Sequence, residues 1–117
     1  EEWRTQKETQ RLLDKYFTTK PDGIPGNDDT GTMSSWAIFN MIGFYPDCPG
    51  LPEYTLTTPV FNKVTIRLDP KWYKENELVI ETNRTQPGTL YIDKVLLDGK
   101  KFNKYHITHM NLFTANI

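Results

Sequence analysis

One glycine-rich turn carries the residues of this sequence that are best suited to chemistry. Residues 23–31 read Gly-Ile-Pro-Gly-Asn-Asp-Asp-Thr-Gly, which places Asn27, Asp28 and Asp29 side by side. Polar groups at the mouth of a buried element usually serve a site, because burying them without partners costs roughly 2–7 kcal/mol each. The positive end of the helix expected at 32–42 would favour their ionised form. Ionised carboxylates suit a general base or a hard cation.

The same residues allow a plainer interpretation. Asp28 and Asp29 could serve only as helix-capping acids, which is the commoner role of acids at this position. An EF-hand calcium loop is rejected, because its glutamate is expected about six residues after the glycine and position 37 is alanine. Inverting glycoside hydrolysis needs a carboxylic acid and a carboxylate roughly 6.5–9.5 Å apart. The turn could supply the base, but no other acid in the sequence is marked as its partner.

Composition narrows the class of protein. The 117 residues fit one modest domain, and 37% hydrophobic with 25% charged residues is typical of a globular chain. A net charge of -1 argues against a nucleic-acid binder. Cys48 is the only cysteine, so an internal disulfide is impossible. No apolar run approaches the roughly 18 residues of a membrane span. Because the sequence starts without a Met or a signal-peptide pattern, we expect a segment of a longer protein.

Two helices are expected in the first half of the sequence. Residues 2–18 have acids at the start, an apolar cluster near the end and a polar middle, so this helix should bury one side. Residues 32–42 are apolar on nearly all sides, with Asp29 or Thr30 as the expected N-cap and Gly43 just past the end. A helix that is apolar all round needs cover on all sides. We therefore expect further parts of the protein to cover it.

The second half has the alternation of β-structure. Val64, Ile66 and Leu68 alternate with polar residues, and Asp98-Gly99 predicts a hairpin turn. Thr108 is expected to cap a short helical turn at 109–113. The fold class predicted is α+β: two N-terminal helices followed by a mostly antiparallel β-sheet. The expected strands cover residues 54–57, 63–68, 77–82, 90–97 and 101–105.

Other side chains are weaker candidates for a functional role. Trp3 and Trp36 could stack on a sugar ring, but a tryptophan at helical spacing is more often a core residue. His106 and His109 are three residues apart, a spacing that can share a metal. With no third ligand nearby, packing is the favoured interpretation. The triplet 83–85 matches a glycosylation sequon, a match that is frequent by chance.

Several blocks together resemble a known family. Residues 26–36, Gly-Asn-Asp-Asp-Thr-Gly-Thr-Met-Ser-Ser-Trp, and residues 43–46, Gly-Phe-Tyr-Pro, closely resemble the C-terminal signature of glycoside hydrolase family 92. These are exo-acting α-mannosidases of bacterial type. The blocks at 3–6, 49–54, 59–66 and 105–109 resemble further family segments in the same order. The resemblance thus covers nearly the whole chain.

The resemblance implies an architecture. Family members join an N-terminal β-sandwich to an (α/α)6 barrel. Residues 1–46 would be the last helices of that catalytic barrel, and residues 47–117 a C-terminal β-rich extension. The missing β-sandwich and the remaining barrel of the same polypeptide would then be partners of this chain. The resemblance also implies an extracytoplasmic bacterial enzyme.

The resemblance implies a mechanism as well. Members are calcium-dependent and inverting, although no calcium ligand can be assigned in this chain. The presumed general base of the family corresponds to Asp29, and Asn27 stands where some members have a second acid. An asparagine can hydrogen-bond the attacking water but cannot take its proton. Asp28 occupies the intervening acidic position, whose role the motif does not define.

These inferences give two hypotheses. In the first, the chain is a C-terminal part of an α-mannosidase that removes terminal mannose, α-1,2-linked, from mannose-rich glycans, with Asp29 as base. The chain alone is then expected to be inactive, because the general acid lies outside it. In the second, the chain is a non-catalytic carbohydrate-binding or structural β-module with Asp28 and Asp29 as helix caps.

Overall fold

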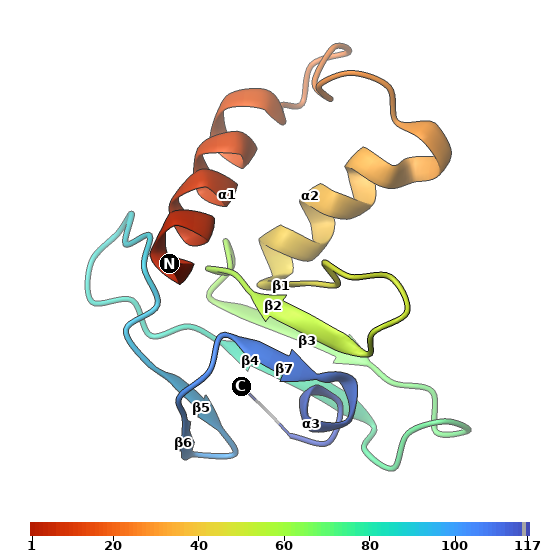
Figure 1. Ribbon diagram of the computed structural model, residues 1–117, viewed down its shortest axis with the longest axis vertical. Coiled ribbons are helices and arrows are strands. Elements are labelled where there is room, and N and C mark those ends of the chain that lie inside the picture. The colour runs from red at the N-terminus through yellow and green to blue at the C-terminus, as the bar shows by residue number, and fades with distance from the viewer. Residues whose placement is uncertain (116) are drawn as a thin grey trace.

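Two antiparallel-running helices rise from one side of a group of small β-sheets (Figure 1). The structure, a computed structural model, describes residues 1–115 and 117. Helix α1 covers Glu2–Tyr16 and ends two residues earlier than predicted, because Phe17 takes an extended conformation with φ -104° and ψ 112°. Helix α2 covers Thr32–Ile42, as predicted. The existence of both helices is therefore confirmed.

Gly43 ends α2 and turns the chain directly into the first strand. Its φ of 117° lies in the region that favours glycine, and its N–H donates to the Phe39 carbonyl at 3.0 Å. A Cβ atom at this position would lie 2.6 Å from Cγ of Pro59. Both the backbone conformation and this close approach therefore require glycine, which confirms the predicted role of Gly43.

The strands form three small antiparallel sheets. In the described residues, β1 (Phe44–Tyr45), β2 (Glu53–Leu56) and β7 (His106–Thr108) pair in the order β1-β2-β7. Strands β3 (Lys63–Arg67) and β4 (Glu77–Glu81) form a second sheet. Strands β5 (Val95–Leu97) and β6 (Lys100–Phe102) form the predicted hairpin around Asp98-Gly99. The α+β class is confirmed, although several small sheets replace the one expected.

The largest difference from the predicted strands is at residues 90–97, where only the last three pair with a neighbouring strand. The Ile92 N–H donates instead to Oε1 of Gln6 at 3.1 Å, and the Ile92 carbonyl accepts from the Tyr105 hydroxyl at 3.3 Å. Side chains therefore take the hydrogen bonds that a partner strand would have made. Residues 101–105 are likewise strand only as far as Phe102.

The hydrophobic core lies among the sheets, and α2 reaches it through its C-terminal end. The short helix α3 (His109–Leu112) closes one side, and the Thr108 hydroxyl accepts from the Asn111 N–H at 3.3 Å, which confirms the predicted cap. Partly buried Phe39 and Ile42 of α2 pack against this core. Within the described residues, no helix is long and apolar enough to cross a membrane. The buried core residues are Phe44, Leu56, Leu78, Ile80, Val95, Ile107 and Leu112.

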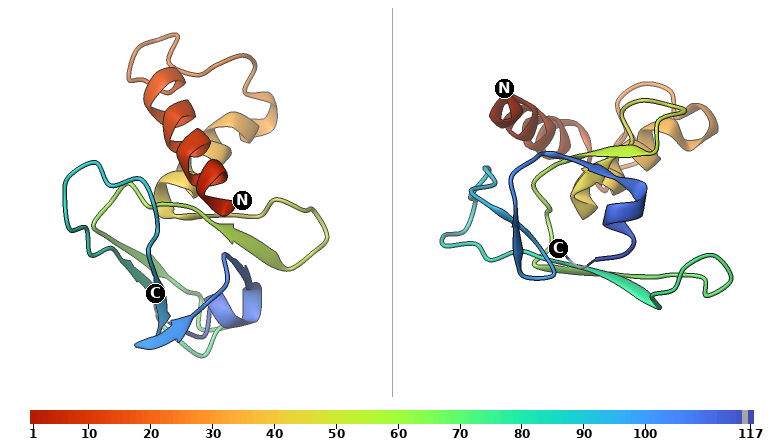
Figure 2. Two further views of the ribbon diagram at one scale, coloured as in Figure 1. Left: turned by 60° about the vertical axis from the view of Figure 1, so that its left-hand side comes forward. Right: turned by 60° about the horizontal axis from the view of Figure 1, so that its bottom comes forward.

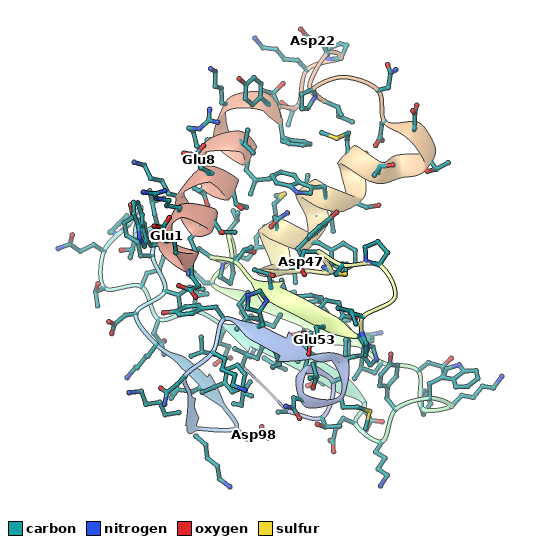
Figure 3. The ribbon with its side chains drawn as sticks, in the orientation of Figure 1. Glu1, Glu8, Asp22, Asp47, Glu53 and Asp98 are labelled. Atoms are coloured by element: carbon teal, nitrogen blue, oxygen red, sulfur yellow. The ribbon has the colours of Figure 1, made fainter. Side chains whose placement is uncertain are left out.

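The turn with the candidate site lies away from the core. The segment that joins α1 to α2 is at the end of the two helices farthest from the sheets (Figures 1 and 2). In Figure 3 its residue Asp22 is at the top of the molecule and Asp98 of the β5–β6 hairpin is at the bottom. The helices therefore carry the turn outward from the β-layers.

Helix α1 is attached to the β-part of the chain by a buried polar side chain. Gln6 is 3% exposed, and its hydrogen bond to Ile92 spans 86 residues of sequence. Of the polar residues in the middle of this helix, Gln6 thus lies on the buried side, whereas Thr5 and Arg11 are exposed. We predict that Gln6→Ala lowers the free energy of unfolding by about 1–3 kcal/mol, because the Ile92 N–H loses its partner.

Chemical denaturation measures this change, and Gln10→Ala is the matched control. Gln10 lies one turn further along α1, and its side chain donates a surface hydrogen bond to Oδ1 of Asp14 at 2.9 Å. Its loss should cost less than about 0.5 kcal/mol. Equal destabilisation by the two variants would contradict a structural role for the buried amide.

Candidate functional site

The turn before α2 has a tightly constrained backbone. Asp29–Gly31 form a short 3-10 turn, closed by a hydrogen bond from the Gly31 N–H to the Asp28 carbonyl at 3.0 Å. Thr30 has φ 54° and Gly31 has φ 76°, so two successive residues are left-handed. The Asp29 carbonyl accepts from the hydroxyls of Thr30 and Thr32. These bonds fix the main chain on both sides of Asp29.

The Asp28 carboxylate caps helix α2. Oδ1 accepts from the backbone N–H groups of Met33 at 2.8 Å and Ser34 at 2.9 Å, and Oδ2 accepts from the Ser34 hydroxyl at 2.5 Å. These bonds satisfy N–H groups that have no partner within the helix. The Ser34 hydroxyl, the Ser34 N–H and the Met33 N–H together hold the pKa of Asp28 below its usual value.

The predicted identity of the helix cap is therefore wrong. Asp29 or Thr30 was the expected N-cap, but Gly31 occupies that position and Asp28 supplies the capping carboxylate from three residues earlier. The difference arises because the 3-10 turn separates the acids from the helix. The adjacent Thr30-Gly31 pair is the sequence signal for it, because glycine is the residue that most readily takes a left-handed conformation.

The two neighbouring aspartates differ in the hydrogen bonds that their side chains accept. Within residues 1–115 and 117, no hydrogen bond reaches the side chain of Asp29 or that of Asn27, and both residues are exposed. Asp28, in contrast, uses both carboxylate oxygens. The structure thus brings the three predicted site residues into one turn but leaves only Asn27 and Asp29 available to another molecule.

The turn is not enclosed by this chain. One hollow of about 440 Å³ is lined by residues near the N-terminus with Asp47, Thr55 and His106. Another of about 850 Å³ lies among the sheets and is lined in part by Arg84 and Tyr91. Neither includes a residue of the turn at 23–31. The exposed Asp29 thus lies outside both hollows.

Trp36 and His109 pack against other side chains, whereas Trp3 and His106 are exposed. Trp36 stacks on Phe17 with ring centroids 5.5 Å apart, which fixes the start of the joining segment on α2. Trp3 is exposed, with the Arg4 guanidinium 5.3 Å from its ring centroid. The His109 ring lies between two tyrosine hydroxyls, with Nδ1 at 2.8 Å from Tyr54 and Nε2 at 3.2 Å from Tyr73. These contacts agree with the packing interpretation of Trp36 and His109.

A calcium site is not formed by the residues at hand. Calcium takes six to eight oxygen ligands, usually several of them carboxylates. In the part of the chain that the structure describes, no group of three or more His, Cys, Asp or Glu residues could hold a metal ion. His106, which contacts the Thr55 hydroxyl at 3.2 Å, and His109 do not converge on one. The residues of the turn do not fit a complete calcium site.

The two helices and the attached small sheets have the fold of part of a known class of enzyme domain. Residues 1–116 match the glycosyl hydrolase family 92 catalytic domain. The chain belongs to this family. A curated relative, a secreted glycosidase of Arthroderma benhamiae described as uncharacterized, is 30% identical over 103 residues, which are 88% of this chain and 13% of the relative.

Solved structures give the same result. A family 92 α-mannosidase of Bacteroides thetaiotaomicron in complex with mannoimidazole is 29% identical, with a TM-score of 0.86 over 98% of this chain and 15% of its own. A family 92 inverting mannosidase of the same bacterium is 34% identical, with a TM-score of 0.82 over 99% of this chain and 16% of its own. This chain thus spans about a seventh of the proteins that it matches.

The lowered pKa of Asp28 predicts a pH dependence of stability. The folded state binds the Asp28 proton less tightly than the unfolded state, so the carboxylate stabilises the fold at pH values above the ordinary aspartate pKa. This contribution is lost as the pH falls through the lower folded-state pKa. Thermal melts of the wild type and Asp28→Asn between about pH 6 and about pH 2 measure it.

Asparagine is the informative replacement, because it caps helices about as well as aspartate but does not ionise. We expect the stability difference between wild type and Asp28→Asn to shrink as the pH falls. Asp22→Asn is the control, because Asp22 lies in the same joining segment, at the tip of the helical pair (Figure 3). A difference that is constant across this pH range would contradict the assignment.

Proposed function

We propose that this chain supplies the general-base side of an exo-α-mannosidase active site within a longer polypeptide. The single observation that carries the proposal is the free, exposed carboxylate of Asp29 on a turn whose main chain is fixed. Family membership and the mannosidase relatives support it. The substrate would be a terminal mannose, α-1,2-linked, of a mannose-rich glycan.

In the proposed reaction, Asp29 accepts a proton from a water molecule. The oxygen of that water forms a bond to the anomeric carbon, while a carboxylic acid outside this chain protonates the departing glycosidic oxygen as its bond breaks. Attack from the face opposite the leaving group inverts the configuration. The Asn27 amide, which is equally exposed, would orient the water by a hydrogen bond.

Asp29 is the better base of the two aspartates. A general base must have a lone pair free for the incoming proton. The Asp28 oxygens already accept three hydrogen bonds, and its lowered pKa makes it a weaker base. The Asp29 oxygens have no such partner in the described residues, so the proton can be taken without breaking a helix cap.

The rest of the site would come from further parts of the same polypeptide. We propose that residues 1–46 are the last helices of an (α/α)6 barrel, that residues 47–117 are its C-terminal β-extension, and that a β-sandwich completes the domain. The match to only about 15% of a family 92 mannosidase supports this arrangement. Trp3 and Ile38, 50% and 56% exposed on the two helices, would pack against it.

The proposal also covers the calcium ligands of the complete domain and the location of the whole protein. Any calcium of the complete domain would be held largely by residues outside this chain, so added calcium should leave the melting temperature of the isolated chain unchanged. The secreted glycosidase relative supports an extracytoplasmic location for the whole protein.

Replacement of Asp29 in the longer polypeptide tests the role of the base. Asp29→Ala should lower kcat by about 10²–10⁴-fold, because proton transfer from water is lost. Azide needs no deprotonation to attack, so it should restore turnover of a mannoside with a good leaving group and yield a mannosyl azide of inverted configuration. NMR of the product and initial rates measure both effects.

The control is Asp22→Ala, since Asp22 lies in the same joining segment and should leave kcat unchanged. The rival hypothesis of a non-catalytic module gains support from the cap made by Asp28, but Asp29 makes no such cap. Unchanged turnover in Asp29→Ala would favour that module and reject the proposed base.

The isolated chain is expected to be inactive. On the acidic turn, only Asp29 among the described residues has a carboxylate without hydrogen bonds, whereas inversion needs an acid and a base. Release of mannose from an α-1,2-mannobioside should therefore be indistinguishable from that by the Asp29→Ala form of the same chain. Turnover at a rate comparable with that of a complete family 92 enzyme would overturn this expectation.

A further inference from the structure

We infer that Asp28 is the positioning residue of this site: by occupying the first free N–H groups of α2, it keeps the Asp29 carboxylate from doing so. This inference rests on the proposed function, because it concerns the availability of the proposed base. It assigns a role to the acidic position that the motif leaves undefined.

The first argument is that hydrogen bonds hold both the main chain and the side chain of Asp28. Asp28 is held at three oxygens, because its carbonyl accepts from the Gly31 N–H and its carboxylate accepts from Met33 and Ser34. The next carbonyl, that of Asp29, is held by two threonine hydroxyls. The main chain is therefore fixed on both sides of the Asp29 Cα atom, while its side chain remains free.

The second argument concerns the hydrogen bonds that Asp29 could make if the Asp28 side chain were absent. The first N–H groups of a helix attract any carboxylate within reach, through hydrogen bonds and the helix dipole. If the Asp28 side chain were removed, the N–H groups of Met33 and Ser34 would lose their acceptor. Asp29 is the nearest remaining carboxylate in the sequence. Capture of Asp29 by the helix would turn its carboxylate away from the substrate side and would occupy the oxygens that the attacking water needs.

The third argument is that the role requires an acceptor of the right shape rather than a charge. An asparagine at position 28 can accept the two N–H bonds with its Oδ1 atom, and the Ser34 hydroxyl can rotate to accept from the new amide. Asp28→Asn should thus keep Asp29 free, whereas Asp28→Ala should not. A group that takes part in proton transfer would not be replaced by asparagine.

The test uses the longer polypeptide that contains the chain, at temperatures where each variant is shown by its melting curve to be folded. For Asp28→Ala we expect kcat to fall by about 10–100-fold, since small displacements of a reacting group have effects of this size. KM should stay within about threefold, because binding of the sugar is not removed. The loss should therefore fall on kcat rather than on KM, because the base is displaced while the sugar still binds.

Two further variants separate positioning from general stability. Asp28→Asn should retain both kcat and KM within about threefold of the wild-type values. Ser34→Ala removes one of the three carboxylate bonds and should have an intermediate effect. Ser35→Ala is its matched control, because Ser35 is the exposed next residue of α2 and no side-chain hydrogen bond is recorded for it in the described residues.

The outcomes are distinct. A folded Asp28→Ala protein with wild-type kcat would overturn the inference, because the cap would then serve stability alone. Asp28→Asn that is as slow as Asp28→Ala would also overturn it, because the ionised group itself would be required. The role of Asp29 as the base is tested separately. Retained turnover, or the absence of azide rescue, in Asp29→Ala would reject it.

Discussion

The N–H groups at the start of α2 must find acceptors, and the whole arrangement of the acidic turn follows from how they do so. The 3-10 turn at 29–31 moves the helix start past the acids, so the capping carboxylate reaches it from Asp28. One acid is committed to the backbone of the helix. Its neighbour is thereby left with a fixed main chain and unoccupied oxygens. Two adjacent residues of the same type thus acquire different chemical properties from their hydrogen bonds alone.

The β-part of the molecule supports this turn from a distance. Its core packs against the C-terminal end of α2, while the buried Gln6 amide attaches α1 to Ile92. The stack of Trp36 on Phe17 joins the two helices near the turn. Neither helix is long enough to be stable by propensity alone. The position of the acidic turn therefore depends on contacts at the opposite ends of both helices.

Much of this architecture could be predicted from the sequence, because it depends on local signals. The acidic start and apolar end of residues 2–18 predicted α1, and the apolar run at 32–42 predicted α2. The alternation at 63–68 predicted β3, and the Asp98-Gly99 pair predicted the hairpin. The strand expected from residue 90 failed because Gln6, distant in sequence, takes the Ile92 N–H. The division of roles between Asp28 and Asp29 was missed for a similar reason. It is decided by Thr30, a non-glycine residue with positive φ, and by Ser34, and local propensities reveal neither contribution.

The absence of a side chain at Gly43 has a mechanical consequence. Its carbonyl accepts from Thr57 at 2.9 Å, and its Cα faces Pro59 too closely for any other residue. Helix α2 therefore joins strand β1 through this one fixed residue, without a flexible linker. Its 11 residues make this helix about 16 Å long. A tilt of about 4° at the C-terminal end of α2 would move its N-terminal end by about 1 Å. Substitutions within the β-sheets would therefore displace the acidic turn.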